Sequence, residues 1–321
     1  MYIVTGALGF IGTCLVRELN NRGIENILLV DRLDKSSKWK NFQEIKFFDY
    51  IDADNFLEML YDFPEELADK VQGVFHLGAC SSTTEMDMNY LMENNVNYSK
   101  TVFEFCTANE IPLVYASSAA TYGDGENGYD DESDISQLRP LNPYGQSKQL
   151  FDQWAHKQNI TPPKWFGVKF FNVFGPFEYH KGEMRSVVHK AFEQINSSGK
   201  VRLFKSHKEG YSDGEQLRDF IYGVDAARAC VDMLDGDVHC DSGIYNLGTG
   251  SARSFKDLVT ATFVAMNRPV NIEYFDMPEN LRDQYQYFTE AKMDKFSKLL
   301  PDFKFLSLEQ AVEDYVKNYL S

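Results

Sequence analysis

Three glycines spaced three residues apart follow directly on a short apolar run at the start of the chain. The segment TGALGFIG places Gly6, Gly9 and Gly12 behind the apolar residues 2–5, and a helical pattern begins at Thr13. Glycine lets a backbone turn tightly off a strand, lets main chain approach a phosphate, and lets a helix pack closely on a sheet. The order of strand, glycine turn and helix therefore predicts a βα turn that binds an anion at free N–H groups.

A second apolar run, residues 27–30, ends at Asp31, about 20 residues after the glycines. An acid at this place in a Rossmann unit hydrogen-bonds the ribose of a bound dinucleotide. The glycine spacing alone is weak evidence, because a glycine-rich turn needs no ligand. Here the strand, helix, second strand and terminal acid stand in the expected order, and together they predict a dinucleotide site.

Strand-like runs alternate with helical segments along the first half of the chain. The strand-like runs are residues 2–5, 27–30, 45–48, 74–77, 113–117 and 165–171. The helical segments are residues 56–61, 98–109 and 147–158. Such alternation predicts an α/β fold with a doubly wound parallel sheet of the Rossmann type and ligands at the carboxyl ends of its strands.

The pattern becomes irregular after Pro176, apart from a helix-and-strand return near residues 225–247. No Pro/Ser-rich linker or repeat separates two domains. We therefore expect a dinucleotide-binding domain of residues 1–174 and 219–248. A smaller, interleaved C-terminal substrate lobe is expected from the remaining segments, residues 175–218 and 249–321.

Composition excludes several classes of function. A formal net charge of −16 argues against nucleic acid as a partner. No signal peptide or membrane-length apolar run is visible, and five cysteines without a CxxC pair fit reduced thiols, so we expect a cytoplasmic protein that binds no membrane and no metal. Residues 181–208 are basic by contrast, and part of this segment is a candidate for receiving an anionic substrate.

Tyr144 and Lys148 are candidates for acid/base chemistry. They stand in the segment NPYGQSK, where a helix is expected to begin after a proline, and a spacing of four puts both side chains on one helix face. A free phenol has a pKa of about 10, but a neighbouring ammonium and a cationic nicotinamide would favour the phenolate. Such a pair often occurs by chance on an exposed helix; Ser118, after the preceding strand, strengthens the assignment because its hydroxyl can orient a substrate oxygen.

Together these motifs resemble the extended short-chain dehydrogenase/reductase superfamily, and the match runs over essentially the whole chain. Features of its nucleotide-sugar enzymes are FNVFGP at 171–176, RDFI at 218–221 and NLGTG at 246–250. Within it, the chain most closely resembles the ADP-L-glycero-D-manno-heptose 6-epimerase family. That resemblance rests on GACSSTTE at 78–85, YASSAATYG at 115–123, HKG at 180–182 and DGEQLRDF at 213–220.

The resemblance implies an isomerase that oxidises the C6 hydroxyl of an ADP-heptose to a ketone and reduces it again from the opposite face. A secondary alcohol carbon without a neighbouring carbonyl has no acidic proton, so simple deprotonation cannot invert it. The family's pattern places the two acid/base groups at Tyr144 and Lys181, with Ser118 and Lys148 beside them; a phosphate or ribose contact is the alternative role for Lys181. The family acts in lipopolysaccharide core biosynthesis and forms homo-oligomers, commonly pentamers.

The choice between NADP and NAD depends on the residues around Asp31. Asp31 would repel a 2′-phosphate and suits NAD, whereas Arg32 and Lys38 can pair with that phosphate. The family uses NADP with an acid at the position of Asp31. We therefore expect NADP, with NAD as the alternative.

The resemblance also assigns the remaining ligand contacts. The expected cofactor-binding residues are Gly6, Gly9, Phe10, Ile11, Gly12, Asp31, Arg32, Lys38, Leu77, Gly78, Ala79, Cys80, Ser81, Asn94, Lys148, Val173 and Lys181. The expected substrate-binding residues are Ser118, Asn172, Glu183, Lys190, Phe204, Lys205, Ser206, His207, Arg218 and Tyr285. Arg218 is the best bidentate donor for the diphosphate. Glu183 and Lys190 depart from the family's usual residues, a small hydroxyl and a histidine.

Three alternative functions remain open on these residues. A UDP-galactose 4-epimerase shares every motif except HKG and CSSTT. A 4,6-dehydratase is disfavoured because its extra acid pair is replaced here by residues 119–122 (AATY). A non-catalytic NADP-sensing protein would be expected to lose Tyr144 or Lys148, and both are present.

Overall fold

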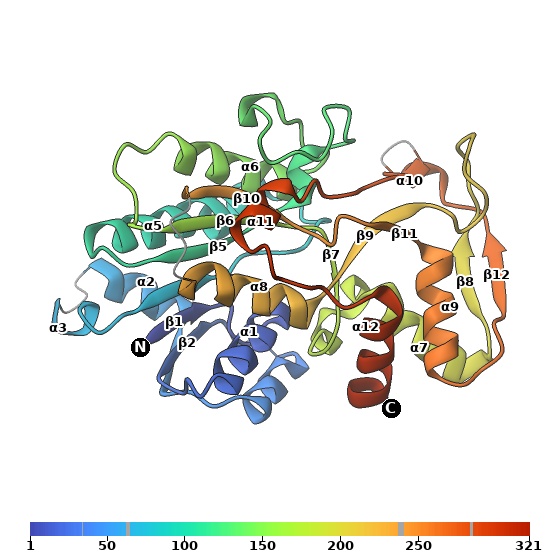
Figure 1. The fold of residues 1–321 in the computed structure, drawn as a ribbon, viewed down its shortest axis with the longest axis horizontal. Coiled ribbons are helices and arrows are strands. Elements are labelled where there is room, and N and C mark those ends of the chain that lie inside the picture. The colour runs from blue at the N-terminus through green and yellow to red at the C-terminus, as the bar shows by residue number, and fades with distance from the viewer. Residues whose placement is uncertain (34, 62–64, 237–240, 283–284) are drawn as a thin grey trace.

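A seven-stranded parallel sheet forms the centre of the computed structural model, which describes residues 1–33, 35–61, 65–236, 241–282 and 285–321 (Figure 1). Its strand order is β10-β6-β5-β4-β1-β2-β3, and every neighbouring pair is parallel. The order runs outward in both directions from β1 and β4, so the predicted doubly wound α/β fold is confirmed. The strands are β1 (Tyr2–Thr5), β2 (Ile27–Asp31), β3 (Asp49–Asp52), β4 (Gly73–His76), β5 (Leu113–Ser118), β6 (Trp165–Phe170) and β10 (Gly243–Leu247).

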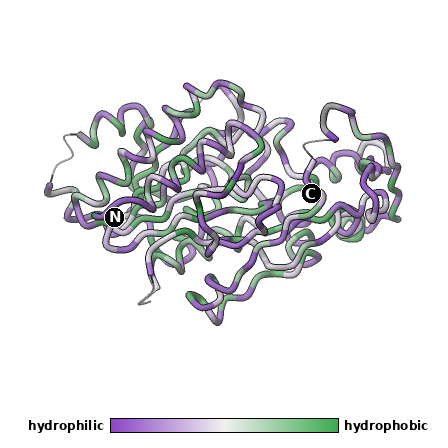
Figure 2. Tube along the Cα trace, turned by 90° about the horizontal axis from the view of Figure 1, so that it is seen from above, coloured by the Kyte–Doolittle hydropathy of each residue, from purple (hydrophilic) through white to green (hydrophobic). Residues whose placement is uncertain are grey.

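Helices cover both faces of this sheet. One face carries α1 (Phe10–Asn21) and α8 (Gly223–Asp235), which pack on each other; the other carries α2 (Ala53–Tyr61), α5 (Tyr98–Ala108) and α6 (Pro143–His156) (Figure 1). Figure 2 shows hydrophobic and hydrophilic stretches alternating along the trace, as amphipathic helices on a sheet require. Among the described residues, no helix combines the length and the apolar character needed to cross a bilayer.

Successive residues of the central strands point into two different apolar cores. In β1, Val4 belongs to the core shared with α1 and α8, whereas Ile3 belongs to the core shared with α2, α5 and α6. All four residues of the strand are buried. Burial on both faces explains why the sequence shows a continuous apolar run instead of an alternation.

A smaller lobe lies at one end of the sheet, on the right in Figure 1. It contains a three-stranded sheet, β11-β9-β7, and a parallel pair, β12-β8. Its strands are β7 (Asn172–Phe174), β8 (Val201–Phe204), β9 (Leu217–Tyr222), β11 (Ala252–Ser254) and β12 (Ile272–Phe275). Its main helices are α7 (Val187–Ser198), α9 (Phe255–Ala265) and α12 (Leu308–Tyr315).

One helix from the predicted substrate lobe packs against the large sheet instead. Helix α11 (Asp294–Leu299) contacts β10, and Phe296 and Leu299 join the core of α1 and α8. The predicted domain boundaries stay a prediction. The remaining short helical elements are α3 (Glu65–Ala68), α4 (Met88–Leu91), α10 (Glu279–Arg282), η1 (Ser37–Glu44), η2 (Met92–Asn97), η3 (Ala119–Tyr122), η4 (Ile135–Gln137), η5 (Tyr179–Met184) and η6 (Val316–Leu320).

Two local predictions were wrong in their bounds. The strand expected at residues 45–48 begins only at Asp49. Ile45 is buried but lies in a loop, and Phe48 is 68% exposed, so this apolar run does not mark a strand. As an edge strand with its first residue exposed, β3 lacks the apolar pattern that marks the inner strands. The first helix begins at Phe10 and not at Thr13, since Gly9 is its N-cap.

The glycine turn depends on very close backbone contacts. Gly6 has a left-handed φ of +65°, and a Cβ there would lie 2.8 Å from the Gly78 nitrogen. A Cβ on Gly12 would lie 2.0 Å from the Gly6 carbonyl oxygen. These distances leave no room for a side chain, so the turn is held against the loop after β4 and a phosphate can meet bare main chain.

We predict that Gly12→Ala destabilises the protein although it lies inside a helix. Alanine normally favours a helix interior by about 1 kcal/mol over glycine. The clash with the Gly6 oxygen outweighs this, and overpacking of this kind costs about 1–3 kcal/mol. Urea unfolding would measure the loss, with Asn21→Ala at the exposed end of the same helix as control. A gain in stability for Gly12→Ala would contradict the assigned contact.

Candidate active site

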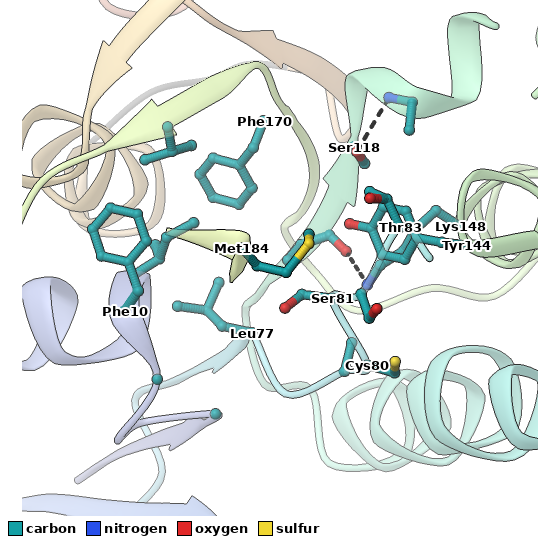
Figure 3. Close-up of a pocket in the computed structure, with 18 of the residues that line it drawn as sticks. Phe10, Leu77, Cys80, Ser81, Thr83, Ser118, Tyr144, Lys148, Phe170 and Met184 are labelled. Carbon is teal, nitrogen blue, oxygen red and sulfur yellow. Dashed lines mark hydrogen bonds between the residues drawn. The ribbon is translucent and has the colours of Figure 1, made fainter. Parts of the chain in front are cut away.

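A cavity of about 940 Å³ opens along the carboxyl ends of β1, β2, β4 and β5. Figure 3 shows part of its wall, with Leu77 and Ser81 from the loop after β4 and Tyr144 from α6. Every residue that the resemblance assigned to the cofactor lines this cavity. Because the glycine turn that forms one wall has no space for side chains, the residues present fit a bound dinucleotide.

Asp31 is held by the backbone and by a lysine. Its carboxylate accepts hydrogen bonds from the Leu8 N–H at 2.8 Å and the Arg32 N–H at 2.7 Å. Lys38 Nζ lies 2.5 Å from the same carboxylate. The side chain is 5% exposed and lies at the edge of the cavity, so one carboxylate orders both the glycine turn and Lys38.

Helix α6 presents Tyr144 and Lys148 to the cavity, as the spacing predicts (Figure 3). The helix begins where expected, because the Asn142 side chain accepts the Gly145 N–H at 2.7 Å and Pro143 occupies its first turn. Lys148 Nζ donates to the Ala116 carbonyl oxygen at 2.9 Å. The last residue of β5, Ser118, hydrogen-bonds Tyr144.

Burial, and not the lysine, dominates the pKa of Tyr144. Desolvation raises that pKa, and the hydrogen bond from Ser118 lowers it only in part. Desolvation also lowers the pKa of Lys148 to about 8, against the opposing charge of Asp152. The expected lowering of the Tyr144 pKa by Lys148 is therefore not found among the protein groups, and the protein alone keeps the phenol protonated at neutral pH.

A buried ion pair lies directly behind these residues. Lys169 Nζ on β6 is 2.6 Å from Asp152 Oδ2 on α6, and the two side chains are 2% and 1% exposed. Asp152 also accepts the Ser117 hydroxyl at 2.6 Å, while Lys169 donates to the Thr121 hydroxyl at 2.6 Å. Thr121 in turn donates to the Ser118 carbonyl oxygen at 2.8 Å. This network joins β5, β6 and α6 just behind the candidate side chains Tyr144, Lys148 and Ser118.

Lys181 reaches the same cavity from η5. The half-buried side chain lies over the Phe10 ring at 5.6 Å. Burial lowers the pKa of Lys181, and the nearby Glu178 opposes this shift. Glu178 is itself buried and accepts the Ser186 N–H at 2.6 Å and the Tyr315 hydroxyl at 2.9 Å, so the segment carrying Lys181 is fastened to α7 and α12.

The predicted substrate residues fall into three separate places. Ser118 and Asn172 line the cavity. A second group surrounds Arg218, whose guanidinium lies 5.2 Å from the ring of Tyr285, and Phe204 meets the same ring at 6.2 Å.

Glu183 and Lys190 form the third place. Their charged groups lie 3.5 Å apart, and Glu183 is 97% exposed. In the described structure, the predicted substrate residues that do not line the cavity are Glu183, Lys190, Phe204, Lys205, Ser206, His207, Arg218 and Tyr285.

Much of the basic segment is neutralised by acids elsewhere in the chain. Lys200 on β8 pairs with Glu273 on β12, and Arg202 lies 3.5 Å from the same carboxylate. Lys205 is 3.5 Å from Asp276. These three cations are thus paired with acids, while Lys181, from the same segment, lines the cavity.

Sequence reasoning missed two cavity residues near the end of the chain. Gln286 donates to the Gly123 carbonyl oxygen, and Thr289 donates to the Asn172 side chain at 3.4 Å. Both lie in an irregular stretch after α10, where no periodicity or motif marks them. Met184 also lines the cavity (Figure 3), and it stands two residues after the HKG motif in the sequence.

The RDF and NLGTG motifs meet each other in the structure. Asp219 is fully buried and accepts the backbone N–H groups of Thr249, Gly250 and Ala291 at 2.7, 2.9 and 3.1 Å. A Cβ on Gly248 would lie 2.4 Å from Asp219 Oδ2. Asp219 thus links the two motifs, and the neighbouring Arg218 is thereby placed beside its aromatic partners.

Fold and cavity together define a nucleotide-sugar epimerase of the short-chain dehydrogenase/reductase type. The model of the NAD dependent epimerase/dehydratase family matches residues 2–248, and the chain belongs to that family. This membership confirms an epimerase fold and a nicotinamide cofactor, without deciding between NADP and NAD.

Two sequence relatives and one solved structure narrow the assignment from this family to one kind of epimerase. The chain is 49% identical to an ADP-L-glycero-D-manno-heptose-6-epimerase of Fusobacterium nucleatum and 48% identical to one of Nitratidesulfovibrio vulgaris, each over 100% of this chain and 98% of the relative. The solved Helicobacter pylori ADP-L-glycero-D-manno-heptose-6-epimerase superposes with a TM-score of 0.79 at 27% identity, covering 98% of this chain and 94% of that one. The chain belongs to the ADP-L-glycero-D-manno-heptose-6-epimerases, as its motifs indicated, and the 4-epimerase alternative is disfavoured.

We predict that Lys148→Met stabilises the nucleotide-free protein at neutral pH. The folded-state pKa of about 8 lies below the unfolded value of 10.5, so the ammonium is unfavourable in the fold. The shift corresponds to roughly 3 kcal/mol at most, and the lost bond to the Ala116 oxygen offsets part of it, which leaves a gain of about 1–2 kcal/mol.

The gain should shrink as pH rises above 8, since the wild-type folded chain then sheds the proton that the unfolded chain keeps until about pH 10.5. Denaturant unfolding at several pH values would measure it. Lys157→Met, at the exposed end of α6, is the control. If Lys148→Met instead loses stability by an amount that does not depend on pH, the buried ammonium of Lys148 does not destabilise the fold.

Proposed function

We propose that this chain epimerises C6 of the heptose in ADP-D-glycero-D-manno-heptose, giving ADP-L-glycero-D-manno-heptose. The observation that carries the proposal is a single cavity that joins the glycine turn, the pair Tyr144 and Lys148, and Lys181. The names of the relatives support the same substrate.

The chemistry requires a transient ketone. C6 bears a secondary alcohol with no adjacent carbonyl, so direct deprotonation does not invert it. A nicotinamide cofactor supplies the oxidation and the subsequent reduction at C6. The chain's own groups then have three tasks, which are to hold the sugar, to move the hydroxyl proton, and to let the ketone present its other face.

Tyr144 and Lys181 are the proposed proton-transfer groups. The raised pKa of Tyr144 favours the phenol, which can donate a proton to the ketone oxygen, and Ser118 can orient that oxygen. In the reverse half-reaction the phenolate accepts the hydroxyl proton of the same epimer. Burial lowers the pKa of Lys181, so its ammonium gives up a proton more readily than an exposed lysine does, and the amine can then accept one. One such group for each face of the ketone accounts for both epimers, and a phosphate or ribose contact is the other role open to Lys181.

Nucleotide recognition is proposed for the group around Arg218. Its guanidinium is buried among aromatic rings and offers a planar, bidentate donor for a diphosphate. Phe204 and Tyr285 provide apolar surface beside it. Lys190 and Glu183, which bond each other, are weaker candidates for sugar contacts.

NADP is the proposed cofactor and NAD the alternative. Arg32 and Lys38 both lie at the cavity edge with Asp31, where a 2′-phosphate would need cations. A cytoplasmic location and a homo-oligomeric assembly stay predictions.

Two measurements test the proposal directly. Native mass spectrometry of the purified protein is expected to show retained NADP, because an enzyme that restores its own cofactor in each turnover has no need to release it. Incubation with ADP-D-glycero-D-manno-heptose, followed by chromatography, is expected to give the L-glycero epimer. Absence of conversion, or efficient conversion of UDP-galactose instead, would refute the proposed substrate.

Tyr144→Phe is predicted to lower turnover by about a hundredfold or more, the usual contribution of a positioned proton-transfer group. Retention of the cofactor should change little, since the phenol oxygen alone is removed. Steady-state epimerisation and bound nucleotide content give the two readings. Tyr61→Phe, at an exposed tyrosine that does not line the cavity, is the control. Near-normal turnover in Tyr144→Phe would remove this residue from the mechanism.

Lys181→Met is predicted to slow the oxidation of one epimer more than the other, with Tyr144→Phe showing the opposite asymmetry. The reason is that each group would serve one face of the ketone. Single-turnover formation of reduced cofactor, started from each epimer separately, measures the two half-reactions. Lys200→Met is the control. If Lys181→Met raises KM and leaves both half-reactions intact, Lys181 is a binding residue and one base serves both faces.

A further inference from the structure

The two cations that would receive a 2′-phosphate are already bound to acids. The Arg32 side chain contacts Asp54 Oδ1 with two nitrogens, Nε at 3.2 Å and Nη2, and its Nη1 donates to Asn94 Oδ1 at 2.5 Å. Lys38 is bound to Asp31 at 2.5 Å. The Arg32 and Asp54 side chains are 47% and 64% exposed, so solvent ions and ligands can reach this pair.

The local fold brings an excess of carboxylates to this place. Parallel pairing sets Asp31 at the end of β2 beside Asp52 at the end of β3. The chain then turns into α2, where the Asp54 N–H donates to Asp52 Oδ1 at 2.9 Å and the Asp54 side chain faces Arg32. The cluster therefore holds three carboxylates, those of Asp31, Asp52 and Asp54, and two cations, Arg32 and Lys38. A phosphate dianion would approach a cluster without net positive charge.

We infer that Asp54 is a specificity-determining residue that competes with the 2′-phosphate of NADP for Arg32 and thereby shifts the cofactor preference toward NAD. This inference rests on the proposed function for its choice of cofactors. A 2′-phosphate can take Arg32 bidentately only if Asp54 gives up its two contacts, and Asp54 then remains as a like charge beside the phosphate. The ribose hydroxyl of NAD is uncharged and needs no such exchange.

Asn94 and Lys38 have different parts in this competition. Asn94 is neutral and holds Arg32 next to the cavity without opposing an anion. Lys38 is bound to the more deeply buried Asp31, which also holds the glycine turn. Asp54 is therefore the acid that can be neutralised without disturbing the dinucleotide site.

The decisive variant is Asp54→Asn, which keeps the shape and an oxygen acceptor while it removes the charge. Purified protein would be brought to exchange equilibrium in equimolar NAD and NADP, starting once from NAD-loaded and once from NADP-loaded protein. The bound nucleotides would then be released by denaturation and quantified by mass spectrometry. Agreement between the two starting points shows that equilibrium has been reached.

Asp54→Asn is expected to raise the bound ratio of NADP to NAD about three- to tenfold, in the range of an exposed ion pair with an added like-charge repulsion. Asp49→Asn is the matched control, because it removes the same charge from an exposed position at the other end of β3, roughly 10 Å from Asp52. That control should change the bound ratio of NADP to NAD by no more than about twofold, since the distance from Asp49 to Asp52 is close to one Debye length.

An unchanged ratio in Asp54→Asn, or an equal change in Asp49→Asn, would overturn the inference. Asp54→Ala must change the ratio in the same direction, and Arg32→Met should abolish the effect of Asp54→Asn. The readout needs no turnover. A protein that binds both nucleotides and fails to convert ADP-heptose would therefore refute the proposed function and leave the assignment of Asp54 standing.

Discussion

The buried ion pair between Lys169 and Asp152 is the interaction on which the active-site geometry depends. Removing two charges from water costs several kcal/mol per ion, and the attraction between them compensates only when hydrogen bonds complete the arrangement. Here the Ser117, Tyr115 and Thr121 hydroxyls do so. The pair thereby fixes α6 against β5 and β6, and with them the relative positions of the side chains that α6 and β5 present to the cavity.

Burial sets the pKa of both Tyr144 and Lys148, and the same network opposes part of that effect at Lys148. Asp152 stands one helical turn beyond Lys148, and its charge favours the ammonium that burial disfavours. Lys148 thus has a pKa of about 8 and Tyr144 is a protonated phenol next to a serine hydroxyl, which suits the proton transfer proposed for this site.

Backbone contacts, and not only side chains, hold the ligand-binding edges. The glycine turn is pressed against the loop after β4, and Asp31 fastens it through the Leu8 N–H. At the other lobe, Asp219 performs a similar task by accepting three backbone N–H groups. In both places a buried carboxylate satisfies main-chain donors that would otherwise be orphaned, which explains why the motifs pair an acid with glycines.

The sequence by itself determined the doubly wound sheet, the glycine turn, the start of α6 and the placement of Tyr144 and Lys148 on one helix face, because each follows from residue patterns and spacing along the chain. It predicted the strand before Asp49 wrongly, since an edge strand has little apolar pattern to detect. Only the tertiary structure decided which charges meet. Arg32 is held by Asp54 and Lys200 by Glu273, and burial raises the pKa of Tyr144 where Lys148 was expected to help lower it. These ion pairs and this pKa shift depend on how closely distant segments of the chain approach each other and on how much water they exclude. Neither the approach nor the exclusion of water can be read from neighbouring residues in the sequence.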